Sequence, residues 1–175
     1  MALEPALLDS SVQKPRVTRE ATVNDLHALV ALFVTENQHN ATLAPETVRV
    51  TSDVLTAPEL QAIIDDAGQQ LLVAEHEGLV VGALLGQITR TREHRWVQSR
   101  CTGYVDELIV SPHARRQGVA DDLLAAFESW AAAQGATALE LHVWSNNDGA
   151  IRFYAQSGFA EKQHLLTKPL RRETP

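Results

Sequence analysis

Cysteine is almost missing from this chain of 175 residues, in which Cys101 is the single example. One cysteine excludes an internal disulfide, and the first residues lack the basic start and apolar stretch of a secretory signal. Together these absences favour a reducing compartment, so we expect a cytoplasmic protein. No apolar run approaches the ~20 residues that a membrane-spanning helix needs, and we therefore expect no membrane partner.

Metal-type spacings and an excess of basic residues are missing as well. The seven histidines show no paired spacing with cysteines or acids of the zinc type, so we predict no metal. Lysine and arginine number 15 against 22 acidic residues, which gives a net charge of −7. This balance disfavours nucleic acid as a partner and is compatible with a cationic amine substrate, although solubility alone also explains an acidic protein.

What the chain has is the composition of a globular protein with a core, with 45% hydrophobic and 21% charged residues. Its length suits one domain, so we predict a flexible tail over 1–15 and a single domain over 16–175. The first half of the chain contains helix-capping residues, a proline that can open a helix, a glycine turn and runs of β-forming residues, which together predict its strands and helices. These are a strand over 16–21, helices beginning at Thr22 and Pro58, and a hairpin of 70–76 with 79–88 around Glu77-Gly78.

The segment from Thr89 to Arg100 holds four arginines around Trp96. It is either a solvated loop between antiparallel strands or an arm that contacts a ligand, and the sequence leaves both open.

The centre of the chain is a strand over Tyr104–Val110, a turn over Ser111–Ala114, and a helix that opens on 115–120. Apolar residues at spacings of three and four give the helix one buried face, and Gly135 ends it. Its N-terminus offers unpaired N–H groups and the positive end of the helix dipole. Because Gly118 lets an anion approach the backbone, this arrangement predicts a phosphate site.

The late part of the chain predicts a strand over 137–144, a short helix after Asn147, and a last strand over 161–170. With the earlier elements this makes about six strands and four helices, with a hairpin early and strand–helix–strand units late. The fold class we predict is therefore α/β, or α+β, with a mixed sheet.

Two familiar phosphate loops are excluded, since neither Gly-Lys-Ser/Thr nor three spaced glycines follow the central strand. The pattern Arg115-x-x-Gly118-x-Ala120 instead resembles the acyl-CoA pyrophosphate loop of the GNAT superfamily of N-acyltransferases. Asn147-x-x-Ala150-x-x-Phe153-Tyr154-x-x-x-Gly158-Phe159 resembles the C-terminal signature of that superfamily, and Val105–Val110 resembles its fourth strand. The resemblance covers about residues 16–170.

The resemblance implies a GNAT fold, with a mostly antiparallel central sheet of about six or seven strands flanked by about four helices. It also implies transfer of an acetyl group from acetyl-CoA, by direct attack, to a primary amine of a small molecule or protein. A non-catalytic domain that binds acyl-CoA, or a regulatory one, is the alternative. The acceptor, the acyl-chain length and the oligomeric state stay open, a homodimer included.

The same resemblance assigns the cofactor site. Pyrophosphate is expected on the backbone amides of the turn and helix start, pantetheine along the end of the central strand, and an asparagine on the CoA side. The residues concerned are Leu108, Ile109, Val110, Arg115, Arg116, Gln117, Gly118, Val119, Ala120 and Asn147.

The resemblance makes Tyr154 the general acid toward the CoA sulfur, with a buried core tyrosine as the structural alternative. The base stays open among Asp106, Glu107 and His142, as does a reaction without a strong base, since many members of the family need none. Strand alternation places Asp106 and Glu107 on opposite faces, so at most one is expected to face the acceptor. Cys101 has no partner histidine in any motif, and we expect Cys101→Ala to keep activity.

Overall fold

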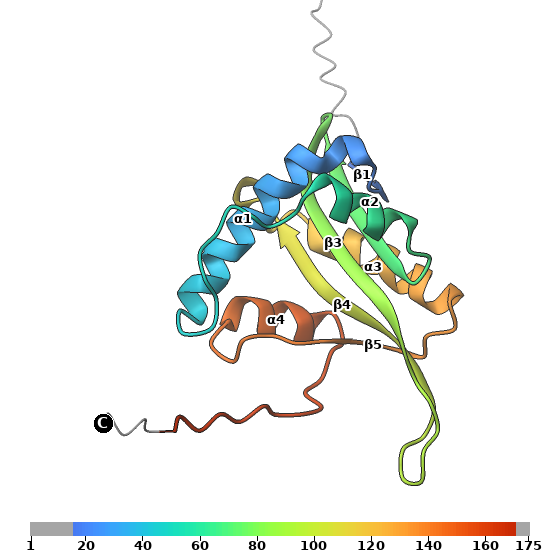
Figure 1. The fold of residues 1–175 in the computed structure, drawn as a ribbon. Coiled ribbons are helices and arrows are strands. Elements are labelled where there is room, and N and C mark those ends of the chain that lie inside the picture. Colours follow the sequence, from blue (N-terminus) through green and yellow to red (C-terminus); the bar gives the residue numbers. More distant parts are fainter. Residues whose placement is uncertain (1–15, 171–175) are drawn as a thin grey trace, which may run out of the picture. The chain divides into compact units, whose positions relative to one another are not determined.

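The computed structural model describes residues 16–170, which fall into two compact units divided after His142. The predicted tail over 1–15 lies outside the described residues. The first unit is a five-stranded sheet in the order β1-β2-β3-β4-β5 with helices on both faces (Figure 1). Its strands are β1 Val17–Glu20, β2 Gln69–His76, β3 Leu79–Thr91, β4 Arg100–Val110 and β5 Ala138–Leu141.

The sheet is antiparallel from β1 to β4, and β5 joins β4 in parallel. Glu77 and Gly78 connect β2 to β3 with φ angles of 53° and 83°. Two successive positive φ angles are the geometry of a two-residue hairpin turn with the twist of its strands. The predicted hairpin and the predicted mixed, mostly antiparallel sheet are both confirmed.

Two helices of the first unit pack on one face of the sheet. The first helical region starts at the predicted cap Thr22, and the second helix starts one residue before the predicted Pro58, at a cap that was not predicted. A 3₁₀ turn, Val23–Asp25, leads into α1, Leu26–Leu43, and Thr22 and Asp25 form a capping box there. Thr56 and Glu59 form another at the start of α2, Ala57–Asp65. The core beneath these helices contains Leu29, Leu32, Leu60, Leu71, Val73, Ala83 and Ile109.

Helix α3, Val119–Ala133, follows the 3₁₀ turn Pro112–Ala114 and covers the other face of the sheet. Phe127 is fully buried there, and a Cβ at Gly86 would lie 2.4 Å from its Cζ atom. Glycine in β3 therefore lets α3 approach the sheet closely. Gly135, with φ of 86°, ends the helix as predicted.

The second unit, 143–170, contains α4, Asp148–Gln156. The predicted strand over 161–170 is wrong, because these residues are exposed and irregular. Leu165 and Leu166 are neighbours rather than alternating, and Pro169 has no N–H for a ladder. The predicted strand over 137–144 is also shorter, so the described residues hold five strands rather than six or seven. Among the described helices none is long and apolar enough to cross a membrane.

Candidate active site

The turn between β4 and α3 presents bare backbone amides. Arg116 and Gly118 have φ angles of 59° and 78°, and Gly118 is the N-cap of α3. Across residues 16–170, no backbone hydrogen bond occupies the amides of Gln117, Gly118, Val119 or Ala120. These N–H groups lie at the positive end of the α3 dipole, where an anion is favoured.

Arg16 holds this turn from the start of the described chain. Its Nη1 donates to the Gln117 carbonyl oxygen at 2.6 Å, and its guanidinium forms an ion pair with Asp122 in the first turn of α3. The Nε of Arg115 donates to the Val110 carbonyl at 3.2 Å, so this arginine folds back over the end of β4. The conformation of the turn is thus fixed by side chains that leave its amides open.

The edge of β4 beside this turn is open. The parallel ladder with β5 covers only Thr102–Val105 of β4. Beyond it, no described strand pairs with residues 106–110 on that side, although Ile109 remains buried in the core. The backbone of Leu108–Val110 is therefore available to pair with an extended chain.

A β-bulge in β4 brings the two strand acids to one face, so the expectation that they face opposite sides is wrong. In the ladder with β3, Leu85 pairs with Glu107 and Gly86 with Val105, which leaves Asp106 as the extra residue. The Nε2 of Gln87 donates to both Asp106 carboxylate oxygens at 2.9 and 3.0 Å. Because Leu85 and Gln87 share a face of β3, Glu107 and Asp106 both lie on that face.

The carboxyls on this face have raised pKa values. Burial raises the pKa of Glu107 to about 7, and the carboxylates of Glu36 and Asp106 add to the effect. Burial also raises the pKa of Glu36, on α1, against the opposing pull of His39 and Arg115. For Asp106, burial raises the pKa and the hydrogen bond from Gln87 opposes it. Near neutral pH Glu107 can both accept and release a proton, as a general base requires.

His142 follows the end of β5 and is hydrogen-bonded to a residue of β4. The Tyr104 hydroxyl is hydrogen-bonded to its Nδ1, and the two rings meet edge to face with centroids 5.8 Å apart. Burial and the negative charges of Asp106 and Glu140 raise the pKa of Tyr104, so its hydroxyl keeps its proton. Tyr104 pairs with Gln87 across the ladder and so shares the face of the two acids.

Asn147 and Tyr154 belong to the second unit. The Asn147 Oδ1 accepts a hydrogen bond from the Ala150 amide at 3.1 Å, so this residue is the N-cap of α4. The ring of Tyr154 makes edge contacts with Phe153 and Phe159, at centroid distances of 5.2 and 5.5 Å. The aromatic and glycine positions of the C-terminal signature therefore serve to pack this short helix, and the catalytic role of Tyr154 stays a prediction.

The structure brings together Asp106, Glu107 and His142, three of the four predicted catalytic residues. Sequence reasoning missed Glu36, Gln87 and Tyr104, which surround them. Tyr104 and Gln87 could have been found from the sequence, since both are polar residues on predicted strands, and buried polar side chains are usually hydrogen-bonded to one another or to other groups. Glu36 carried none that a sequence reveals, because only the packing of α1 over the sheet places it near Glu107.

Cys101 lies at the start of β4, and the phosphate-type turn follows the other end of that strand. Its Sγ is 3.9 Å from the Gln134 carbonyl oxygen. Within the described range, no group of three or more His, Cys, Asp or Glu side chains is arranged to hold a metal ion.

The sheet, the turn with free amides and the open edge of β4 are the features of an acyltransferase fold. Comparison with known proteins leads to the same class. The model of the acetyltransferase (GNAT) family matches residues 26–159. YhfO, an uncharacterized N-acetyltransferase of Bacillus subtilis strain 168, is 31% identical over 144 residues, which are 82% of this chain and 89% of YhfO. This chain therefore belongs to the GNAT acetyltransferase family and is an N-acetyltransferase, as its motifs predict.

Solved structures show the same fold at lower identity. A mutant of the BH1408 protein of Bacillus halodurans superposes with a TM-score of 0.85 at 24% identity, over 89% of this chain and 99% of that one. The aminoglycoside acetyltransferase AAC(6′)-Iy, in complex with a bisubstrate analogue of CoA and acetylneamine, superposes at 0.67 with 18% identity, over 91% and 100%.

Proposed function

We propose that this chain transfers an acetyl group from acetyl-CoA to a primary amine, of a small molecule or a protein, by direct attack. The observation that carries the proposal is Glu107, a partly buried carboxyl beside the open edge of β4 whose pKa is raised to about 7, chiefly by burial. A carboxyl with such a pKa is matched to proton removal at neutral pH.

The part of the site that would bind acetyl-CoA consists mainly of backbone groups. The amides from Arg116 to Ala120 would hold the pyrophosphate of CoA, with the side chains of Arg115 and Arg116 adding positive charge. Pantetheine would extend along Leu108–Val110, where β4 lacks a described strand neighbour. Asn147 would contact CoA in addition to capping α4.

The part of the site that would bind the amine acceptor is negatively charged. Glu36, Asp106 and Glu107 favour the approach of an ammonium group, and the Glu107 carboxylate then takes one of its protons. The neutral nitrogen attacks the thioester carbonyl, so a C–N bond forms and the C–S bond breaks. The departing thiolate takes a proton from the Tyr154 hydroxyl, the role that the C-terminal signature implies. The nitrogen loses its second proton as the amide forms, and that proton returns through solvent to the tyrosinate and restores its hydroxyl. His142 and Asp106 are each held by a hydrogen bond, with Tyr104 and Gln87 respectively, and would help to position the amine on the same face of the sheet as Glu107.

The test follows free thiol while the protein is mixed with acetyl-CoA and a panel of amines. The panel contains a polyamine, neamine, amino acids and a peptide with a free N-terminus, since an aminoglycoside is the acceptor type in one structural neighbour. We expect acceptor-dependent thiol release that falls by about 10²–10⁴-fold in Glu107→Gln, the usual range for a general base. Cys101→Ala is the control and should match the wild type.

Calorimetric titration with CoA separates catalysis from binding in the same proteins. Glu107→Gln should bind CoA as the wild type does. Full activity of Glu107→Gln would remove Glu107 from the mechanism. CoA binding without thiol release on any amine would instead favour the alternative of a non-catalytic acyl-CoA-binding domain.

A further inference from the structure

A glutamine of β3, Gln87, holds one of the two strand acids from the neighbouring strand. Its Nε2 lies 2.9 and 3.0 Å from the two carboxylate oxygens of Asp106 and donates to both. A carboxylate that accepts through both oxygens cannot turn without breaking both hydrogen bonds. Gln87 therefore fixes the place at which the negative charge of Asp106 lies.

Asp106 depends on this partner because it is the extra residue of the bulge in β4. Its neighbours Val105 and Glu107 pair with successive residues of β3, so no residue of β3 lies opposite Asp106. The alternation of the ladder does not direct a bulged side chain, and bulges beside active sites commonly re-aim one. Gln87 supplies the missing direction and brings Asp106 to the face of Glu107.

The donor is neutral, so the charge of Asp106 is not cancelled. Glu140, which pairs with Tyr104 across the ladder and shares its face, is instead bound by the guanidinium of Arg100 at 3.0 Å. Across residues 16–170, no basic side chain forms an ion pair with Asp106. A glutamine amide satisfies a carboxylate and leaves its charge free to attract a cation, which an arginine does not.

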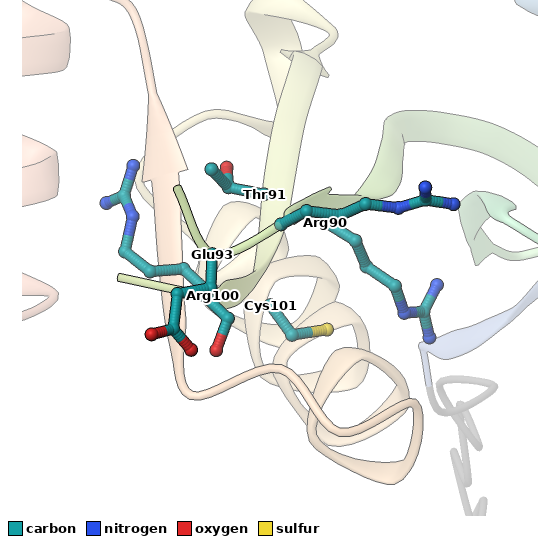
Figure 2. A pocket seen from close by; sticks show the side chains of 7 residues that line it. Arg90, Thr91, Glu93, Arg100 and Cys101 are labelled. Carbon is teal, nitrogen blue, oxygen red and sulfur yellow. The ribbon is translucent and has the colours of Figure 1, made fainter. Parts of the chain in front are cut away.

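Arginines gather at the other end of β4, where it is joined to β3. Arg90, Arg92 and Arg100 line a shallow hollow there together with Glu93 (Figure 2). Positive charge at this end repels an ammonium group, while the acids farther along the strand attract it. The charges along β4 thus direct a cationic amine toward Asp106 and its neighbour.

The two strand acids differ in the protonation state that each favours. The pKa of Glu107 is raised to about 7, so this carboxyl is partly protonated at neutral pH. Burial raises the pKa of Asp106 as well, but the hydrogen bond from Gln87 opposes the rise and favours the carboxylate. The titratable groups around the two acids are Glu36 on α1, Tyr104 on β4, Glu140 on β5 and His142 after it.

Transfer to an alkylamine makes use of both states. The amine arrives as an ammonium, and once Glu107 has taken a proton that carboxyl carries no charge. Attack on the thioester places positive charge on the nitrogen again, until its second proton leaves. A second carboxylate that stays ionised holds the amine through both steps.

We propose that Gln87 is a positioning residue, which holds Asp106 as the ionised anchor of the acceptor's ammonium group while Glu107 removes the proton. The inference rests on the proposed function and divides its strand acids into one that binds and one that reacts. It assigns Gln87 to acceptor affinity rather than to the rate of transfer.

The kinetic test uses the amine of the panel that gives the fastest thiol release. Gln87→Met keeps the length of the side chain and removes the donor, so KM for the amine should rise at least about fivefold while kcat changes less than about twofold. Asp106→Asn should do the same, whereas Glu107→Gln lowers kcat. Gln69→Met is the matched control, because Gln69 pairs with Gln87 across the sheet but donates to Asp66 at 2.8 Å. It should keep both constants.

Carbon-13 NMR titration of the Asp106 carboxyl tests the contact without turnover. Gln87→Met should raise the pKa of Asp106, and Gln87→Lys, which keeps a donor but adds a positive charge, should lower it. Gln87→Lys should nevertheless raise KM for the amine, because it cancels the charge that attracts the ammonium. A glutamine with a merely structural role predicts no such opposition between the two measurements.

Four outcomes would each overturn the proposal: wild-type constants in Gln87→Met, a loss confined to kcat, an unchanged Asp106 titration, or an equal rise of KM in Gln69→Met. Absence of thiol release with every amine would overturn the proposed function, and with it the anchor role of Asp106. The two failures are distinguishable, since the first four outcomes are read in proteins that turn over or by NMR alone. Circular dichroism and CoA titration establish that each variant is folded.

Discussion

Two single residues, Glu107 on β4 and Glu36 on α1, set the acid–base chemistry of the candidate site. Burial is the main reason that the pKa of Glu107 rises to about 7, and the nearby Glu36 carboxylate raises it further. A neighbouring negative charge makes ionisation harder, so neutralising Glu36 must lower the pKa of Glu107. The active form of Glu107 is the carboxylate, and activity should rise as the pH rises through this pKa.

Glu36→Gln should therefore shift the acidic limb of the kcat/KM profile toward lower pH, without removing it, because burial remains. The measurement is thiol release against pH, supported by carbon-13 NMR titration of the Glu107 carboxyl. Glu46→Gln changes an exposed acid in the connection after α1 and is the matched control. An unchanged limb in Glu36→Gln would show that the two carboxyls are not coupled in solution.

At the scale of elements, the start of α3 is the feature that function depends on. Gly118 has φ of 78°, and a Cβ there would lie 3.3 Å from the Arg16 Nη2 atom. Gly135 has φ of 86° and open space around it. Alanine at either position takes on the strain of left-handed backbone, about 1–2 kcal/mol, but only Gly118 lies in the amide turn.

Gly118→Ala should displace the amides of the turn and weaken CoA binding by about tenfold or more. A loss of about 1.4 kcal/mol in binding free energy corresponds to a tenfold rise in the dissociation constant. Gly135→Ala should lose similar stability and bind CoA normally. Calorimetric titration measures the affinity, and thermal unfolding measures the shared loss of stability. Equal CoA affinities in the two variants would place the pyrophosphate elsewhere.

Element boundaries show which parts of the fold the sequence predicts. Capping at Thr22, the turn at Glu77-Gly78 and the stop at Gly135 act locally, so their residues predict them directly. The bulge at Asp106 depends on how β4 meets β3, and strand alternation alone gave the wrong face. Glu36 lies near Glu107 only through tertiary packing. The sequence therefore predicts the backbone and the strand acids of the candidate site, but neither the arrangement of those acids nor the place of Glu36 beside them.

At the scale of the whole molecule, motif order predicts the family and hence the fold, while the count of strands was too high. Residues 161–170 contain adjacent rather than alternating leucines, three charged residues and Pro169, and they form no strand. A charged cluster adds to the β1–β2 ladder in holding the first unit together near its described start. The Arg19 guanidinium bonds both Asp25 oxygens at 2.9 Å and Glu75 at 3.1 Å, and so joins β1, β2 and the start of α1.

This cluster predicts how the protein responds to acid. Hydrogen bonds from Arg19 lower the pKa of the buried Asp25 from 3.8 to about 2, outweighing the opposing effect of burial. A carboxyl with a depressed pKa stabilises the fold above its unfolded pKa, and that contribution is lost as the pH falls toward 2. The shift corresponds to about 2 kcal/mol at neutral pH.

Asp25→Asn should thus lower the free energy of unfolding at pH 7 by about 2 kcal/mol, and the difference from the wild type should shrink between pH 4 and pH 2. Urea unfolding at several pH values gives both quantities. Asp53→Asn removes an exposed acid from the connection before α2 and should leave the curve close to that of the wild type. Because Arg19 joins β1 to the start of α1 through this carboxyl, a wild-type acid profile in Asp25→Asn would mean that this ion pair does not contribute to stability in solution.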